Sequence, residues 1–153
     1  MSATTFDLSE EQRGVLDGAD RYARERLAPL AQRMDDEEWW PDREFRALGE
    51  AGYFGITVPT EDGGAGLDLF TSGLVAQAFS RWNPALALSW VAHENLCLNN
   101  LYRNGNDAQR RRYLPGLCDG SRVGCLALTE PGAGSDALGS MCTTARRDGD
   151  HYL

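Results

Sequence analysis

The chain has 153 residues, of which 42% are hydrophobic and 25% are charged, a composition typical of a globular protein with a hydrophobic core. The formal net charge is −8 and the basic residues are spread along the chain, which argues against nucleic acid and anionic lipid as partners. There is no signal-like N-terminal segment and no apolar run near the ~20 residues of a membrane helix. We therefore expect a cytoplasmic protein with reduced cysteines.

The first third of the chain has helical periodicity. Ser9 and Gln12 have capping-box spacing, and the apolar residues that follow recur every three or four positions up to Met34, with Pro29 allowing a kink or a fresh start. Pro41 suits the first turn of a second helix, which Gly49 or Gly52 can end.

Residues 54–59 are expected to be extended, and residues 61–66 form a turn-rich loop. Asp68 can cap a helix that runs to about residue 82. Asn83 and Pro84 then read as the cap and first residue of a helix that continues to about Tyr102. Because that helix is apolar on nearly all sides, we expect it to be buried.

After the second long helix the pattern changes from helix to strand. Gly105 ends that helix, and Asn106 can cap another, which runs to Gly120. Residues 123–128 resemble a short buried strand, residues 129–136 a loop, and residues 141–145 a second strand. A hairpin turn at Asp148-Gly149 leads into a returning strand. The expected fold class is α+β, with an all-α domain over residues 1–120 and the truncated start of a β-barrel domain over residues 121–153.

The stretch Leu126-Ala-Leu-Thr-Glu-Pro-Gly-Ala-Gly-Ser-Asp136 is the strongest candidate for a binding site. Gly132 and Gly134 let a ligand approach the backbone, successive N–H groups can cradle a phosphate, and Ser135 adds a hydroxyl donor. Thr129 could hydrogen-bond the edge of a ring. On composition alone a polar surface turn is the more common meaning of such a loop.

This stretch resembles the first signature of the acyl-CoA dehydrogenase family, in which an ALTEP-like strand end leads into AGSD. Upstream, residues 92–97 (AHENLC) and 103–109 (RNGNDAQ) are most similar to the isovaleryl-CoA branch of that family. The resemblance covers the whole chain, which is well under half of a typical member.

The resemblance implies FAD as cofactor, acyl-CoA as substrate and α,β-dehydrogenation as the reaction. It implies that the cofactor-binding residues are those along the signature, and that Ser135 also meets the CoA end of the substrate: Leu126, Ala127, Leu128, Thr129, Gly134 and Ser135. It also implies that one helix lines the acyl pocket with Ser89, Ala92, His93 and Leu96.

No catalytic residue is expected within these 153 residues, because the family's glutamate base belongs to a C-terminal helical domain. The family further implies an electron-transfer flavoprotein as partner and a tetramer in the full-length form. It also implies that this chain works together with the missing C-terminal domain or with a complementary subunit. Trp90, Val91 and Glu94 stand where the isovaleryl branch tends to carry Tyr, Gly and Ser. A carboxylate near an apolar pocket is costly unless it is paired or turned to solvent.

Other reactive residues have simpler explanations. His93 and Cys97 share a four-residue spacing, but two ligands do not make a zinc site, and we expect no metal. A Ser–His–Asp relay would need a spatial accident. Two hypotheses remain: part of an acyl-CoA dehydrogenase that is inactive by itself, or a non-catalytic FAD- or acyl-CoA-binding or interaction module that keeps the helical scaffold.

Overall fold

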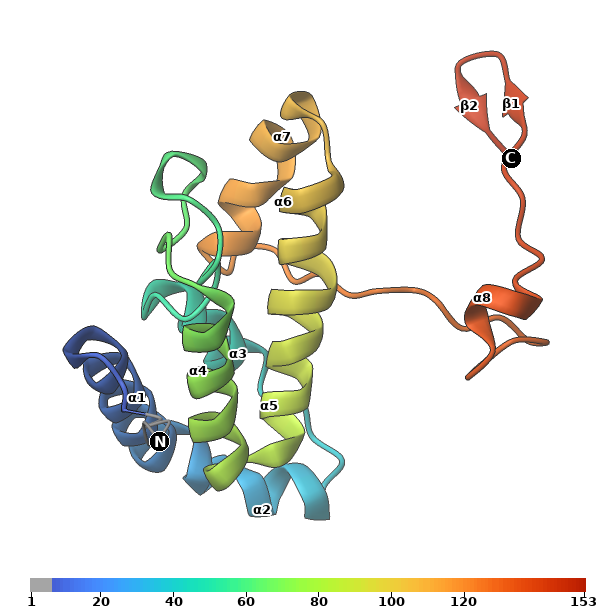
Figure 1. The fold of residues 1–153 in the computed structure, drawn as a ribbon. Coiled ribbons are helices and arrows are strands. Elements are labelled where there is room, and N and C mark those ends of the chain that lie inside the picture. The colour runs from blue at the N-terminus through green and yellow to red at the C-terminus, as the bar shows by residue number, and fades with distance from the viewer. Residues whose placement is uncertain (1–6) are drawn as a thin grey trace, which may run out of the picture.

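The computed structural model describes residues 7–153 and shows a body of packed helices followed by an extended arm that carries a small hairpin (Figure 1). The elements of the body are α1 (Glu10–Tyr22), η1 (Ala23–Leu27), α2 (Ala28–Asp36), α3 (Asp42–Glu50), η2 (Thr60–Asp62), α4 (Leu69–Trp82), α5 (Pro84–Val91), η3 (Ala92–Asn99), α6 (Asn100–Asn104) and α7 (Asp107–Cys118). The elements of the arm are α8 (Ala137–Ser140), β1 (Arg147–Asp148) and β2 (His151–Tyr152). None of the described helices combines the length and the apolar character needed to cross a membrane.

Side chains cap the helices at the positions predicted from the sequence. The Ser9 hydroxyl accepts from the Gln12 N–H at 3.1 Å, and the Gln12 side chain accepts from the Ser9 N–H at 3.1 Å. Asn106 and Gln109 form a second such box, with both distances 2.9 Å. Asp68 accepts from the Thr71 N–H at 2.7 Å. The predicted starts of α1, α4 and α7 are therefore confirmed.

The first helical segment is one continuous rod with a widened middle. α1 and α2 are joined by η1, a π-helical stretch in which the Ala28 N–H donates to the Ala23 carbonyl five residues earlier. Pro29 explains the irregularity, because it has no N–H to continue the ladder and its ring crowds the preceding turn.

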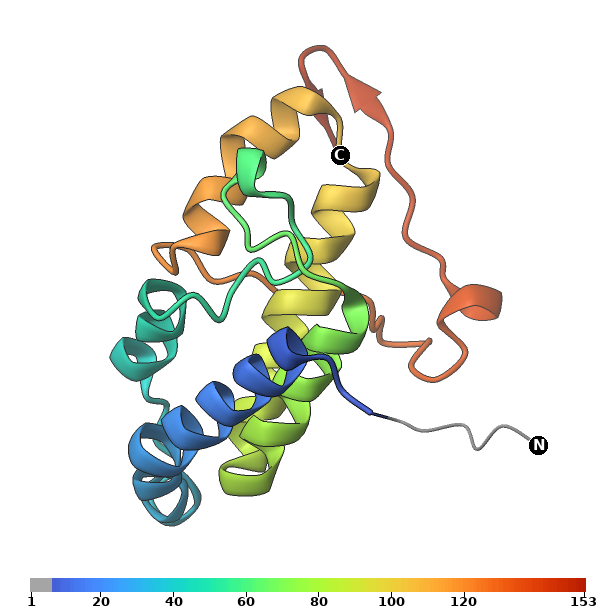
Figure 2. The same cartoon turned by 60° about the vertical axis from the view of Figure 1, so that its left-hand side comes forward.

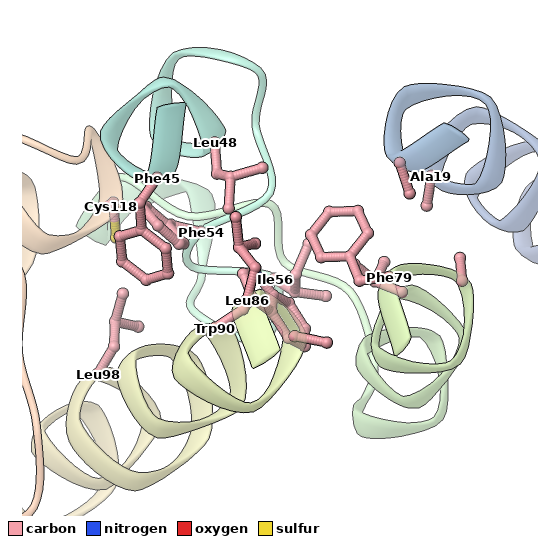
Figure 3. Packing of buried hydrophobic residues seen from close by; sticks show 14 of the residues in the cluster. Ala19, Phe45, Leu48, Phe54, Ile56, Phe79, Leu86, Trp90, Leu98 and Cys118 are labelled. Carbon is pink, nitrogen blue, oxygen red and sulfur yellow. The ribbon is translucent and has the colours of Figure 1, made fainter. Parts of the chain in front are cut away.

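The core lies where α3, α4, α5 and the segment after α3 converge (Figure 3). Phe54, Ile56 and Val58 are buried at alternate positions of that segment. The Ala65 N–H donates to the Gly55 carbonyl at 2.9 Å and the Leu67 N–H donates to the Ile56 carbonyl at 2.8 Å, which folds residues 55–67 into a closed loop. Its apolar side chains meet Phe45, Phe79 and Trp90 in one cluster.

The arm differs from the sequence-based expectation. Residues 123–128 and 141–145 were expected to be strands, but both are extended without a strand partner among residues 7–153. Val123, Leu126 and Leu128 are 42–44% exposed, so the expectation of a buried strand is wrong for this structure. The cause is that a strand needs a neighbour to satisfy its backbone. The expected hairpin turn is present, with Gly149 at φ 60° and Asp148 paired with His151.

Asn83 ties the start of α5 to the end of η1. Its Oδ1 accepts from the Leu86 N–H at 3.0 Å, and its Nδ2 donates to the Leu27 carbonyl at 3.0 Å, with only 1% of the residue exposed. Asn83→Ala is expected to lower the free energy of unfolding by about 2–3 kcal/mol, because it removes the cap of α5 together with the buried hydrogen bond to the Leu27 carbonyl. Urea unfolding measures this, with the exposed cap variant Asn106→Ala as control at about 1 kcal/mol. Equal losses in the two variants would show that the bond to Leu27 contributes nothing.

Candidate functional site

One side of the α5–η3 helix carries three of the four residues expected at an acyl pocket. Ser89 and Ala92 are half-buried and Leu96 is 45% exposed. Leu96 and Leu126 line a shallow cleft of about 310 Å³ between the helix and the start of the arm. The cleft brings the expected substrate-facing helix next to the first residue of the expected flavin-facing segment.

His93, the fourth expected residue, does not lie on this side. It is fully buried, and its ring packs against that of Phe54 in a tilted arrangement with the centroids 4.1 Å apart. Its Nδ1 accepts from the Gly124 N–H at 3.0 Å, so the proton is on Nε2, which donates to the Leu117 carbonyl at 3.0 Å. A ring with both nitrogens occupied in the core cannot reach a substrate. The expectation for His93 is therefore corrected: in the π-helical stretch Ala92–Asn99, a four-residue spacing from Ser89 no longer marks one face.

Glu94, next in the chain, is also fully buried, and it points to the loop after α3. Its two carboxylate oxygens accept from the Gly55 and Ile56 N–H groups, each at 2.7 Å. Gly55 has φ 69°, a left-handed conformation that lets successive N–H groups converge on one anion. Burial raises the pKa of Glu94 to about 7, against the lowering effect of these amide hydrogen bonds. The carboxylate is paired with backbone amides and is not turned to solvent.

The expected flavin-facing segment is an exposed strip of unpaired backbone. Residues 125–129 make no backbone hydrogen bond to any part of the chain within residues 7–153. Leu126 and Leu128 each expose 42% of their surface, and Thr129 is exposed beside them. Free N–H and C=O groups next to exposed apolar side chains fit a flat ring with a polar edge, which is the chemistry of a flavin.

The Gly-rich loop at the end of the strip is closed by its own backbone. The Glu130 N–H donates to the Ala133 carbonyl at 2.9 Å, and the reverse bond is 3.1 Å. A side chain at Gly132 or Gly134 would meet nothing within 4 Å, and Ser135 is exposed, so the loop is open to a phosphate-sized group. Glu130 accepts from the Cys142 and Thr143 N–H groups at 2.8 and 2.9 Å, and hydrogen bonds from Thr143 and then Cys142 lower the pKa of Glu130.

Asp136 caps the short helix α8 by accepting from the Gly139 N–H at 3.2 Å. Glu130 and Asp136 thus both accept from backbone N–H groups of the segment that follows the loop. Within residues 7–153 no three His, Cys, Asp or Glu side chains are grouped so that they could hold a metal ion.

Two features of the site were missed from the sequence. The Gly124 backbone approaches η3 so closely that a Cβ there would collide with the Cys97 sulfur. Glu94 completes the loop after α3. The one signal for this was a carboxylate in a helix rich in Ala and Leu, which calls for a buried partner without identifying it.

The profile of the family described as "Acyl-CoA dehydrogenase, N-terminal domain" matches residues 9–121. The chain belongs to the acyl-CoA dehydrogenase family, as its signature stretch and helices indicated. Mitochondrial isovaleryl-CoA dehydrogenase from Pongo abelii is 46% identical over 148 residues, which is 95% of this chain and 35% of the relative. The chain spans about a third of the length of the curated relatives it matches.

Solved structures agree. An acyl-CoA dehydrogenase from Bacillus anthracis complexed with FAD is 35% identical with a TM-score of 0.88, covering 99% of this chain and 27% of that one. A glutaryl-coenzyme A dehydrogenase in complex with glutaryl-CoA is 31% identical with a TM-score of 0.91, covering 98% of this chain and 38% of that one. The mostly helical fold with a small sheet is therefore that of the N-terminal part of this family.

Proposed function

We propose that the chain is the N-terminal part of an FAD-dependent acyl-CoA dehydrogenase that introduces an α,β double bond into a short or branched acyl-CoA of the isovaleryl-CoA kind. The observation that carries this proposal is the cleft in which Cys125 and Leu126, the start of the unpaired strip 125–129, meet Leu96 of η3. The 46% identity to an isovaleryl-CoA dehydrogenase supports the branched acyl group.

The residues divide the work as follows. The backbone of Leu126, Ala127 and Leu128 and the hydroxyl of Thr129 would hold the ring edge of FAD, while Gly134 and Ser135 would meet its phosphates. Ser135 would also meet the CoA part of the substrate, and Ser89, Ala92 and Leu96 would contact the acyl group. When bound, FAD supplies the acceptor for a hydride from the substrate β-carbon.

We propose no catalytic base among these 153 residues. In the proposed enzyme the base is contributed by a further helical part, electrons pass to an electron-transfer flavoprotein, and the full-length form is a tetramer. The proposed division is a helical domain over residues 1–120 and the beginning of a β domain over residues 121–153. The proposed location is the cytoplasm, whereas the relative from Pongo abelii is named a mitochondrial protein.

The 153-residue chain by itself is expected to bind FAD weakly and to turn over no isovaleryl-CoA, because it would supply only one wall of the flavin site. Flavin absorbance after gel filtration and acyl-CoA-dependent reduction of a dye measure the two properties. The same assays are repeated after adding, as a separate polypeptide, the two-thirds of an isovaleryl-CoA dehydrogenase that lie beyond the matched region.

Gain of bound FAD and of dye reduction in the mixture is the expected result. If the chain stays colourless with every such complement, it is a non-catalytic interaction module and the proposed function is wrong.

A further inference from the structure

Three segments of the chain meet at the ring of His93: the end of α7, the beginning of the arm, and η3 itself. Its Nε2–H donates to the Leu117 carbonyl at 3.0 Å, and its Nδ1 accepts from the Gly124 N–H at 3.0 Å. The ring packs against the aromatic side chains of Phe54 and Phe45, with centroids 4.1 and 6.0 Å away. Aromatic packing and the two hydrogen bonds together hold the imidazole in this orientation.

Among residues 7–153, the bond to Gly124 is the last hydrogen bond between the body and the arm. Beyond it, residues 125–129 make no backbone hydrogen bond, and the bonds of Glu130 stay within the arm. In Figures 1 and 2 the chain leaves the helical body after α7 and runs out as the arm. Gly124 can sit this close to η3 because it has no side chain, since a Cβ would strike Cys97. One imidazole and one glycine therefore make the final attachment, after Arg46 has bound the Gly120 and Ser121 carbonyls.

We propose that His93 is a positioning residue: its neutral Nε2–H form fixes where, and in which direction, the expected flavin-facing segment leaves the helical body. The importance of this for catalysis rests on the proposed function, but the link between His93 and Gly124 does not. His93 acts through the backbone of the next residues, Cys125 to Leu128, and not by touching substrate.

The link depends on the charge of the ring, because a protonated imidazole has no acceptor for the Gly124 N–H. Burial lowers the pKa of His93, which keeps it neutral near pH 7. Few ionisable groups lie around it. Glu94 and Cys97 lie on its own helix, and the Cys118 thiol lies on α7. Arg46 of α3 is the nearby cation, and its guanidinium donates to the Gly120 and Ser121 carbonyls. The faces toward Phe45 and Phe54 are apolar.

Two substitutions separate the hydrogen bond of His93 to Gly124 from its hydrogen bond to Leu117. In His93→Asn, Oδ1 falls near the place of Nδ1 and can still accept from Gly124. In His93→Gln, the amide nitrogen falls near the place of Nε2 and can still donate to Leu117. Amide hydrogen exchange at Gly124, resolved by NMR in the 153-residue chain at pH 7.5, is expected to be about tenfold faster in His93→Gln than in wild type and within about threefold of wild type in His93→Asn.

Acidification adds a readout that simple packing would not give. In wild type the protection of Gly124, relative to Leu98 in the core, is expected to fall as acidification protonates His93, and in His93→Asn it is expected to stay constant. Equal protection of Gly124 in the two variants would overturn the proposal. If the variants do not fold, ring ¹⁵N shifts of the wild-type chain decide: a proton on Nδ1 at pH 7.5 overturns it, and a proton on Nε2 supports it.

Failure of the positioning role and failure of the proposed function give different results. An FAD titration of the same samples, with and without the complementary polypeptide, tests the flavin site. Suppose that the exchange protection of Gly124 changes with the His93 variants as expected, but the chain never takes up FAD. That result would refute the flavin site and support the positioning role.

Discussion

Replacing Glu94 by alanine is expected to lower the free energy of unfolding by about 4 kcal/mol. The substitution removes the acceptors of two buried amides, those of Gly55 and Ile56, which are held at 2.7 Å. Each buried N–H left without a partner costs about 1–3 kcal/mol, and the space vacated by the side chain adds a cavity. The acceptors on the same loop are already used by residues 64–67, so neither amide has another partner at hand. Urea unfolding of the 153-residue chain measures the loss.

Two controls sharpen this result. Glu61→Ala removes an exposed carboxylate from the same loop and is expected to change stability by less than about 0.5 kcal/mol. Glu94→Gln keeps one acceptor and turns an NH₂ group toward the other amide. Its loss of unfolding free energy should therefore lie between that of Glu61→Ala and that of Glu94→Ala. A cost below about 1 kcal/mol for Glu94→Ala would mean that water or a shift of the loop satisfies both amides.

The pH dependence of stability is the second large effect. Because burial raises the pKa of Glu94 from 4.5 in the unfolded chain to about 7 in the fold, the folded state binds this proton more tightly. The resulting stabilisation is fully present below about pH 4.5 and is lost as the pH rises to about 7. A shift of this size corresponds to roughly 3 kcal/mol.

The comparison with Glu94→Gln isolates this contribution, because His93 acts in the opposite direction. Burial lowers the pKa of His93, so its contribution is present above about pH 6.5 and is lost as the pH falls. Urea midpoints between pH 5 and 8 are expected to show wild type losing stability relative to Glu94→Gln as the pH rises. Parallel curves for the two proteins would show that Glu94 is already ionised at pH 5.

The helical part of the fold could be predicted because its signals are local. A capping residue such as Ser9 or Asn106 lies within one turn of the apolar residues that follow it. The structure confirms both caps by their hydrogen bonds. The family could be predicted from the resemblance of the stretch Leu126 to Asp136 to its first signature, and the family match over residues 9–121 confirms the membership.

Features that depend on distant partners could not be predicted in the same way. The segment 123–128 has strand-like composition, but a strand forms only against a neighbour, and the described chain brings none to it. The resemblance to the family implied that His93 lines the acyl pocket with Ser89 and Leu96, but in the π-helical η3 its ring lies in the core. The partners of Glu94 lie 38 and 39 residues away in the sequence, beyond the reach of any spacing argument.

The most direct test of the proposed flavin site is to add FAD to the ¹⁵N-labelled chain and follow its backbone amides by NMR. The largest shifts are expected at Leu126, Leu128, Thr129, Gly134 and Ser135, with smaller ones at Leu96 and none in the cleft between η1 and α3 that Arg26 and Arg43 line. Shifts confined to that cleft, or no shifts at millimolar FAD, would contradict the assignment of residues 126–135 to the flavin.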